Sequence, residues 1–231
     1  MRHVGMVVAA VGLLAAGGAF AQDGDRFGDL IDALGDGAPA TADRFGALAV
    51  AFGEEPMGPW SADLADDGST YTLTNTEDVN AYRLFMTPEG KSVGQRRVTA
   101  EVEIAEGDAL SHAGILVAYR EDPLLFYFWA LEPGGYVTLW RLDAESAEYL
   151  TSARAAAIVE GGVNRLTVHE NRDQLSLYVN DELVGLIGGL DGMGEGRFGV
   201  AVWGTGRYVF HSYEETIALP QRAGNARQPD R

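Results

Sequence analysis

The residues of this sequence best suited to ligand chemistry are aromatic rings and planar polar side chains on predicted strands. They are Arg120, Tyr127, Trp129, Trp140, Arg141, His169 and Trp203. Aromatic rings can stack on the apolar faces of sugar rings, and planar polar groups can hydrogen bond to the hydroxyls around them. Successive side chains of a strand point to opposite faces, so Tyr127 and Trp129 share a face opposite Phe126 and Phe128. These residues predict a carbohydrate site, with packing in the core as the alternative for each ring.

The remaining polar residues predict no metal centre. His112, His169 and His211 fall on separate predicted strands, without the short spacing of a histidine metal site. Acidic loops such as Asp191 with Glu195 could offer oxygens to calcium, but acidic loops are expected in so acidic a chain. The sequence also contains no Ser/His/Asp motif, phosphate loop or dinucleotide fingerprint. We therefore expect no cofactor, and calcium is not indicated.

Short strands separated by turns must position the candidate residues. Leu175 to Val179 alternates between apolar and polar residues, as does Arg97 to Ile104, and this period of two predicts strands with one buried face. Asn180-Asp181 predicts a tight hairpin, because both residues tolerate positive φ. His112–Arg120 and Phe126–Leu131 are nearly continuously apolar, which predicts burial on both faces. Several such strands with glycine turns predict an all-β sandwich or jelly roll.

The two ends of the chain differ from this region. Met1–Ala21 has the composition of a cleaved signal peptide, with Ala19-Phe20-Ala21 before the cleavage site, and a membrane anchor is the alternative. The predicted organisation is a signal peptide at 1–21, a short helix and linker at 22–44, a β-sandwich at 45–220 and a disordered tail at 221–231. Within the sandwich, Phe45–Phe52 is expected to form either the first strand or a short helix. We expect a periplasmic or extracellular location.

Composition narrows the range of partners. The chain has 231 residues, no cysteine and a net charge of −17. Cleavage after Ala21 would remove one arginine and no acid, which leaves the protein more negative still. Such acidity argues against nucleic acid and anionic membrane surfaces as partners. The absence of cysteine agrees with a periplasmic protein, and beyond the leader no stretch is long and apolar enough to predict a membrane span.

Five segments together resemble the concanavalin A-like lectin and glucanase superfamily. They are His112–Arg120 (HAGILVAYR), Phe126–Leu131 (FYFWAL), Asn164–Val168 (NRLTV), Leu175–Val184 (LSLYVNDELV) and Gly196–Val200 (GRFGV). Within that superfamily they are similar to laminin-G-like domains and to the 3-keto-disaccharide hydrolase domain, although Asp181 stands where those families usually have glycine. The resemblance covers the region from about Trp60 to Ile217. It implies a jelly roll of two antiparallel sheets, with ligands on the concave face or at its rim.

The resemblance also supplies a catalytic pattern to look for. Retaining glycosidases of this superfamily carry Glu-x-Asp-x-x-Glu on one strand, which brings two carboxylates together. The one Glu-x-Asp here is Glu106-Gly107-Asp108, and Ser111 stands at the third acidic position, so that mechanism is predicted to be absent. Glu101 and Glu103 share a strand face that is expected to be solvated beside Arg97. They would be the best acid pair if that face lined a groove.

The sequence therefore predicts a secreted or periplasmic, non-catalytic carbohydrate-binding β-sandwich protein. One alternative is a hydrolase of the same fold that acts on glycosides or 3-keto-glycosides. Another is a protein-interaction module of the cell envelope. The burial of Trp129 tests the site: an exposed ring is a stacking surface whose loss in Trp129→Ala abolishes glycan binding, whereas a buried ring belongs to the core.

Overall fold

The computed structural model describes residues 44–52, 59–77, 81–87 and 95–218. Its contacts divide the chain into Met1–Ala38 and Pro39–Arg231, and all described residues belong to the second unit. The predicted signal peptide, the predicted tail and, apart from Arg44, the predicted N-terminal helix and linker lie outside the described residues. Within the described part, no helix has the length and apolar character needed to cross a membrane.

The described residues form one short 3₁₀ helix and thirteen strands. The helix η1 covers Gly46–Ala51, where the sequence predicted either a strand or a short helix. The strands are β1 (Trp60–Leu64), β2 (Tyr71–Asn75), β3 (Tyr82–Met86), β4 (Gln95–Gly107), β5 (His112–Glu121), β6 (Leu124–Glu132), β7 (Tyr136–Asp143), β8 (Ala147–Arg154), β9 (Asn164–Asn171), β10 (Gln174–Val179), β11 (Glu182–Gly188), β12 (Arg197–Trp203) and β13 (Gly206–Ala218).

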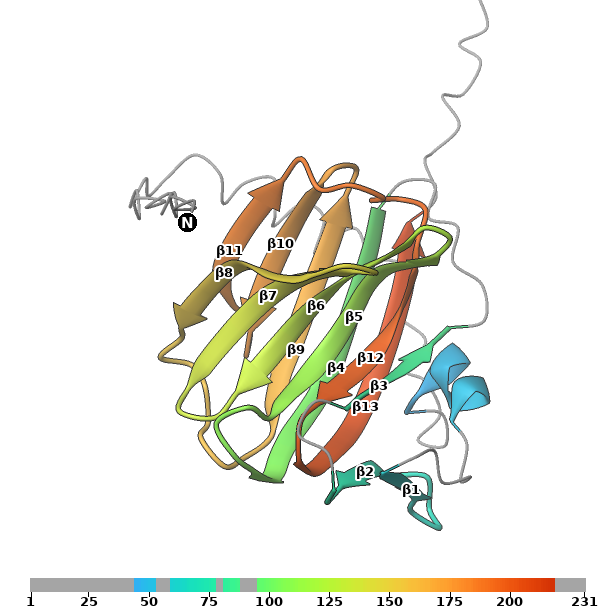
Figure 1. Cartoon of the computed structure of the whole chain (residues 1–231), viewed down its shortest axis with the longest axis vertical. Helices are drawn as coiled ribbons and strands as arrows, with labels where there is room; N and C mark the ends of the chain where they lie inside the picture. Colours follow the sequence, from blue (N-terminus) through green and yellow to red (C-terminus); the bar gives the residue numbers. More distant parts are fainter. Residues whose placement is uncertain (1–43, 53–58, 78–80, 88–94, 219–231) are drawn as a thin grey trace, which may run out of the picture. The chain divides into compact units, whose positions relative to one another are not determined.

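The strands assemble into two antiparallel sheets that lie one behind the other (Figure 1). The seven-stranded sheet has the order β1-β2-β13-β4-β9-β10-β11, and the six-stranded sheet has the order β3-β12-β5-β6-β7-β8. The last two strands of the chain are inserted next to early ones, since β13 pairs with β2 and β4 while β12 pairs with β3 and β5. This arrangement confirms the predicted all-β sandwich of two antiparallel sheets.

One core fills the space between the sheets. Val98, Ala100 and Val102 of β4 are fully buried in it and alternate with less buried residues, as the sequence predicted. Leu175 and Leu177 enter the same core from β10. The core removes the apolar sides of the central strands from water, which is the main force that holds the two sheets together.

Strands β5 and β6 are apolar on both faces. The side chains on the face toward the other sheet, including Ile115 and Trp129, lie in the shared core. Those on the outward face, including Leu116, Phe126 and Phe128, form a second, smaller buried cluster with residues of β7 and β12. The side chains of both faces are therefore buried, as the unbroken apolar runs predicted. The outer face of the six-stranded sheet consequently has an apolar floor.

Candidate functional site

Two of the predicted stacking surfaces, Tyr127 and Trp129, lie inside the core. Each is only 1% exposed. The Tyr127 hydroxyl donates to the carbonyl of Asp191 at 3.1 Å, and Trp129 Nε1 donates to the carbonyl of Tyr178 at 3.4 Å. A buried ring that is hydrogen bonded at its polar end is closed to a sugar, so the assignment of these two rings to a binding site is wrong. The alternation of side chains along a strand correctly placed these two rings on the same face. It could not show that this face meets the other sheet.

The two predicted arginines, Arg120 and Arg141, lie toward the end of the six-stranded sheet away from His112. Arg141 lies opposite Tyr127 in the β6–β7 register and forms an ion pair with Asp143. Arg120 packs against the loop before β12, where its Cζ lies 2.7 Å from the position that a Cβ on Gly192 would occupy. Both side chains therefore make local contacts, at the end of the six-stranded sheet that lies away from His112, the first residue of β5.

His169 lies on the outer face of the seven-stranded sheet, away from Trp140 and Trp203. Its ring centroid is 4.8 Å from that of Tyr178. Burial, with a smaller contribution from the positive charge of Arg97, lowers the pKa of His169 to about 4. The imidazole is therefore neutral at physiological pH, and it does not contribute to the same site as the tryptophans.

Trp140 and Trp203 come together on the outer face of the six-stranded sheet. Their ring centroids lie 5.6 Å apart, with the planes tilted by 44°. The His112 ring lies 5.6 Å from Trp140 and 5.9 Å from Trp203. Tyr149, which is 52% exposed, packs against Trp140 with a centroid distance of 3.6 Å. Because both tryptophans are also partly exposed, these rings form an aromatic surface that solvent reaches.

Glu132 ties these rings together through one carboxylate oxygen, Oε1. Thr138 Oγ1 donates to it at 2.6 Å, the Tyr149 hydroxyl donates to it at 3.3 Å, and His112 Nε2 lies 2.9 Å from it. Trp140 Nε1 in turn donates to Thr138 Oγ1 at 3.1 Å. We refer to the six residues of this group as the aromatic network. Its members are His112, Glu132, Thr138, Trp140, Tyr149 and Trp203.

The His112 ring lies between a backbone carbonyl and the carboxylate of Glu132. Nδ1 lies 2.7 Å from the carbonyl oxygen of Leu110, and Nε2 faces Glu132. Burial raises the pKa of Glu132, but hydrogen bonds from His112 and Thr138 outweigh burial and leave the pKa below its ordinary value. These contacts therefore favour the ionised form of the Glu132 carboxylate.

The second carboxylate oxygen of Glu132, Oε2, remains for a ligand. Thr138 and Tyr149 both donate to Oε1 and His112 Nε2 faces it, and no residue in the described part of the chain donates to Oε2. A carboxylate oxygen is a strong acceptor for a hydroxyl proton, and the neighbouring rings offer apolar surface for stacking. The aromatic network can therefore bind a molecule that combines hydroxyl groups with an apolar face.

Comparison with known proteins defines the fold. No protein-family model matches the chain, and no curated protein matches its sequence. The carbohydrate-binding module CBM66 from Bacillus subtilis superposes with a TM-score of 0.55 at 16% identity, over 68% of this chain and 94% of that one. The GH43 protein BlXynB from Bacillus licheniformis gives 0.53 at 12% identity, over 72% of this chain and 38% of that one. The metal-free carbohydrate recognition domain of Emp46p gives 0.52 at 12% identity, over 75% of this chain and 95% of that one.

The chain shares with these proteins a lectin-like β-sandwich fold of two antiparallel sheets, which is consistent with the fold of the concanavalin A-like superfamily. Likeness at these identities establishes the fold and no more, because one fold hosts many functions. The resemblance found in the five sequence segments is therefore confirmed at the level of the fold. The narrower similarity to laminin-G-like domains and to the 3-keto-disaccharide hydrolase domain stays a prediction.

In this β-sandwich, the strand ends and the alternation of side chains along each strand bring the aromatic network together. His112 opens β5 and lies opposite Trp203, the last residue of β12. Glu132 closes β6, so these three residues meet at one end of the sheet. Trp140 of β7 lies opposite Tyr149 of β8. The network therefore depends on the pairing of five strands.

Sequence reasoning missed most of the polar members of the aromatic network. It did not single out Glu132, Thr138 or Tyr149, and it treated His112 as one of several scattered histidines. A signal was present, because Glu132 has the same strand phase as Phe126 and Phe128. This signal could be used only if the face of β6 that carries these residues were known to point outward, and that depends on how the two sheets pack.

The acidic residues considered for catalysis lie elsewhere in the sandwich. Glu101 and Glu103 are on the outer face of the seven-stranded sheet, where Glu101 pairs with Arg165 at 3.1 Å and Glu103 lies 3.4 Å from His211. Glu106 pairs with an arginine of β13 at 3.2 Å. Within the described ranges, no group of three or more His, Cys, Asp or Glu residues is arranged to hold a metal ion.

Proposed function

We propose that this protein binds carbohydrate through the aromatic network, without cleaving it. The observation that carries the proposal is the partly exposed group of Trp140, Tyr149 and Trp203 around Glu132, whose Oε2 remains for a ligand. A sugar ring presents an apolar face, which rings can stack against, and hydroxyl groups at its edge, which a carboxylate can accept. The buried floor of Leu116 beneath the network keeps these groups in place.

Other observations agree with this proposal. Two structural neighbours, the CBM66 module and the Emp46p domain, are named for carbohydrate binding. The net charge of −17 disfavours polyanionic partners but is indifferent to neutral sugars. The fold similarity does not carry the proposal, which rests on the chemistry of the aromatic network.

Cleavage of the glycan is the main alternative to simple binding. Most glycoside hydrolases use two carboxyl groups about 5 to 9 Å apart, one as acid and the other as nucleophile or base. The aromatic network supplies one carboxylate, Glu132, which is already engaged by His112. We therefore propose binding as the function, and the assay that tests it also detects cleavage.

A glycan array with the protein from Gln22 to Arg231 tests the proposal. Bound protein and released product are both measured, with and without calcium. The proposal predicts binding without product release, in both conditions. Release of product would favour the hydrolase, and calcium dependence would point to an acidic loop instead of the aromatic network. Silence across a broad array would contradict the proposal and favour a protein-interaction module.

We further propose that the protein acts in the periplasm or outside the cell. The apolar run in Met1–Ala21 and its Ala19-Phe20-Ala21 ending support export and cleavage. N-terminal sequencing of the protein recovered from its source cells tests this proposal. A mature chain that begins at Gln22 would support it, and a chain that keeps Met1 would contradict it.

A further inference from the structure

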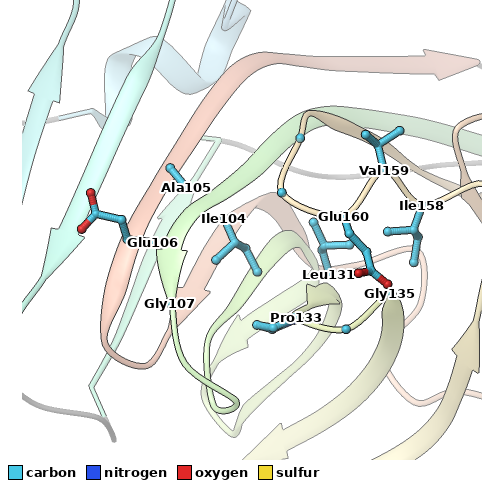
Figure 2. Close-up of a pocket in the computed structure, with 13 residues that line it drawn as sticks. Ile104, Ala105, Glu106, Gly107, Leu131, Pro133, Gly135, Ile158, Val159 and Glu160 are labelled. Carbon is cyan, nitrogen blue, oxygen red and sulfur yellow. The ribbon is translucent and has the colours of Figure 1, made fainter.

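A pocket lies at the rim of the sandwich. It has a volume of about 370 Å³ and forms where the end of β4, the turn between β6 and β7, and the loop before β9 meet (Figure 2). Apolar side chains of Ile104, Leu131, Pro133 and Ile158 line it. Five glycines also line it, which leaves backbone amides and carbonyls at its surface. They are Gly107, Gly134, Gly135, Gly161 and Gly162.

The pocket is connected to the aromatic network through the β6–β7 turn. Glu132 of the aromatic network stands between Leu131 and Pro133, which both line the pocket. Consecutive Cα atoms are only about 3.8 Å apart, so the two sites are separated by little more than one strand end. Tyr136, which follows the turn and is 42% exposed, shares its strand phase with Trp140. An exposed ring therefore lies at the junction of the two sites.

Glu160 provides the pocket with a polar group that a ligand can use. Its side chain points toward Gly135 (Figure 2), and its Oε1 lies 3.0 Å from the position that a Cβ on Gly135 would occupy. Its ion pair with Arg154 is long, at 3.9 Å, and both side chains are exposed. Exposed pairs of this kind contribute little, so the carboxylate can exchange its partner for a hydroxyl group. The carboxylate of Glu106 points away from the pocket (Figure 2).

We propose that this pocket is a second sugar subsite, and that the ligand is an oligosaccharide that crosses the β6–β7 turn from the aromatic network into the pocket. This inference rests on the proposed function. Apolar walls, backbone hydrogen-bonding groups and one carboxylate match a neutral sugar residue. An acidic sugar would face both Glu160 and the strongly negative protein, so the ligand class is a neutral oligosaccharide of two or more residues.

Dependence of affinity on chain length tests the second subsite. Isothermal titration uses xylo-, cello- and fructo-oligosaccharides, each from the monosaccharide to the hexasaccharide. In one of these series, the affinity of the wild-type protein should rise at least about tenfold from the monosaccharide to the longer oligomers. Glu160→Trp introduces a large ring into the pocket from an exposed position. It should remove this gain and leave the affinity for the monosaccharide unchanged.

Glu121→Trp is the matched control, because Glu121 is an exposed glutamate at the other end of β5 from the aromatic network. It should retain the full gain with chain length. A gain that survives Glu160→Trp, or a wild-type affinity that is independent of length, would overturn the second subsite and leave the aromatic network as the binding site. Failure of every oligosaccharide to bind the wild-type protein would overturn this inference and the proposed function together. Equal unfolding temperatures of Glu160→Trp and Glu121→Trp would show that a difference in their affinities arises from binding and not from loss of the fold.

Discussion

Glu132 determines the pH range over which the aromatic network holds together. Its Oε1 accepts hydrogen bonds from Thr138 and Tyr149 and faces His112. These contacts stabilise the ionised form more than burial destabilises it, so the pKa of Glu132 lies below its ordinary value of 4.5. A carboxyl group with a lowered pKa in the folded state stabilises the fold above its unfolded-state pKa. That contribution is lost as the pH falls through the folded-state pKa.

Substitution of Glu132 by Gln should therefore destabilise the protein in a pH-dependent way. At neutral pH we expect Glu132→Gln to lower the free energy of unfolding by about 1 kcal/mol, because the charge-assisted hydrogen bonds are lost. The difference from the wild type should shrink as the pH falls from neutral to about 3. Urea unfolding at a series of pH values measures it. A difference that stays constant over this range would show that the charge of Glu132 does not stabilise the network.

Trp129 and Trp140 should respond differently to truncation. Trp129 is 1% exposed, so Trp129→Ala leaves a cavity in the shared core and should cost about 3–5 kcal/mol of stability. Trp140 is partly exposed on the outer face, so Trp140→Ala should cost less, about 1–2 kcal/mol. Chemical denaturation of both variants gives the two values. Equal losses would be inconsistent with the assignment of one ring to the core and the other to the surface.

Among the elements, the hairpin between β10 and β11 follows the sequence most directly. Asn180 and Asp181 have φ values of 47° and 68°, as the Asn-Asp pair predicted. Asn180 is held on both sides, because its Oδ1 accepts from the backbone N–H of Arg165 at 2.7 Å and its Nδ2 donates to the carbonyl of Ala157 at 2.7 Å. Asp181 makes one exposed ion pair with Arg165, which contributes little to stability.

Asp181→Gly should therefore stabilise the protein by about 0.5–1 kcal/mol, because glycine adopts positive φ without the cost that a Cβ imposes. Asn180→Gly is the control in the same turn, and it should destabilise the protein because three side-chain hydrogen bonds are lost. Thermal unfolding of both variants measures the two changes in stability. A destabilised Asp181→Gly would mean that the ion pair with Arg165 outweighs the backbone strain.

The strands themselves could be predicted from the sequence, but their inner and outer faces could not. The period of two in β4 and β10 shows which residues share a face, because alternation is a local property of the chain. In β6 both phases are apolar, so Trp129 and Phe128 are equivalent from the sequence alone. Which of them meets the other sheet depends on how the sheets stack. For the same reason, Trp140 and Trp203 could be named as candidates, whereas Glu132 became visible only through the pairing of distant strands.

At the scale of the whole molecule, a buried charge cluster links the two sheets. Arg96 of β4 is fully buried, and its Nε lies 3.8 Å from Glu170 Oε2 and 3.4 Å from Glu215 Oε1. Its Nη1 donates to the carbonyl of Gly196 at 3.1 Å, and its guanidinium lies 4.2 Å from the ring centroid of Phe198 in β12. Arg96 therefore pairs with two carboxylates of its own sheet and contacts the other sheet through the Gly196 carbonyl and the Phe198 ring.

Arg96→Met should lower the free energy of unfolding by about 3–5 kcal/mol at neutral pH, because two buried carboxylates lose their positive partner. Burial already raises the pKa of Glu215, although Arg96 opposes this effect. Without the arginine the carboxyl groups can take up protons in acid, so the loss of stability should be smaller near pH 4. Urea unfolding at the two pH values tests this expectation. A loss that is absent at neutral pH would show that the cluster does not stabilise the sandwich.

The most direct test of the sugar site is a calorimetric titration of the best glycan from the array into three proteins. They are the wild type, Trp140→Ala and Tyr178→Ala, the last of which removes a ring from the outer face of the seven-stranded sheet. We predict that Trp140→Ala weakens binding at least about tenfold while Tyr178→Ala binds as the wild type does. Unchanged binding by Trp140→Ala, or a loss in Tyr178→Ala alone, would contradict the assignment of the aromatic network as the carbohydrate site.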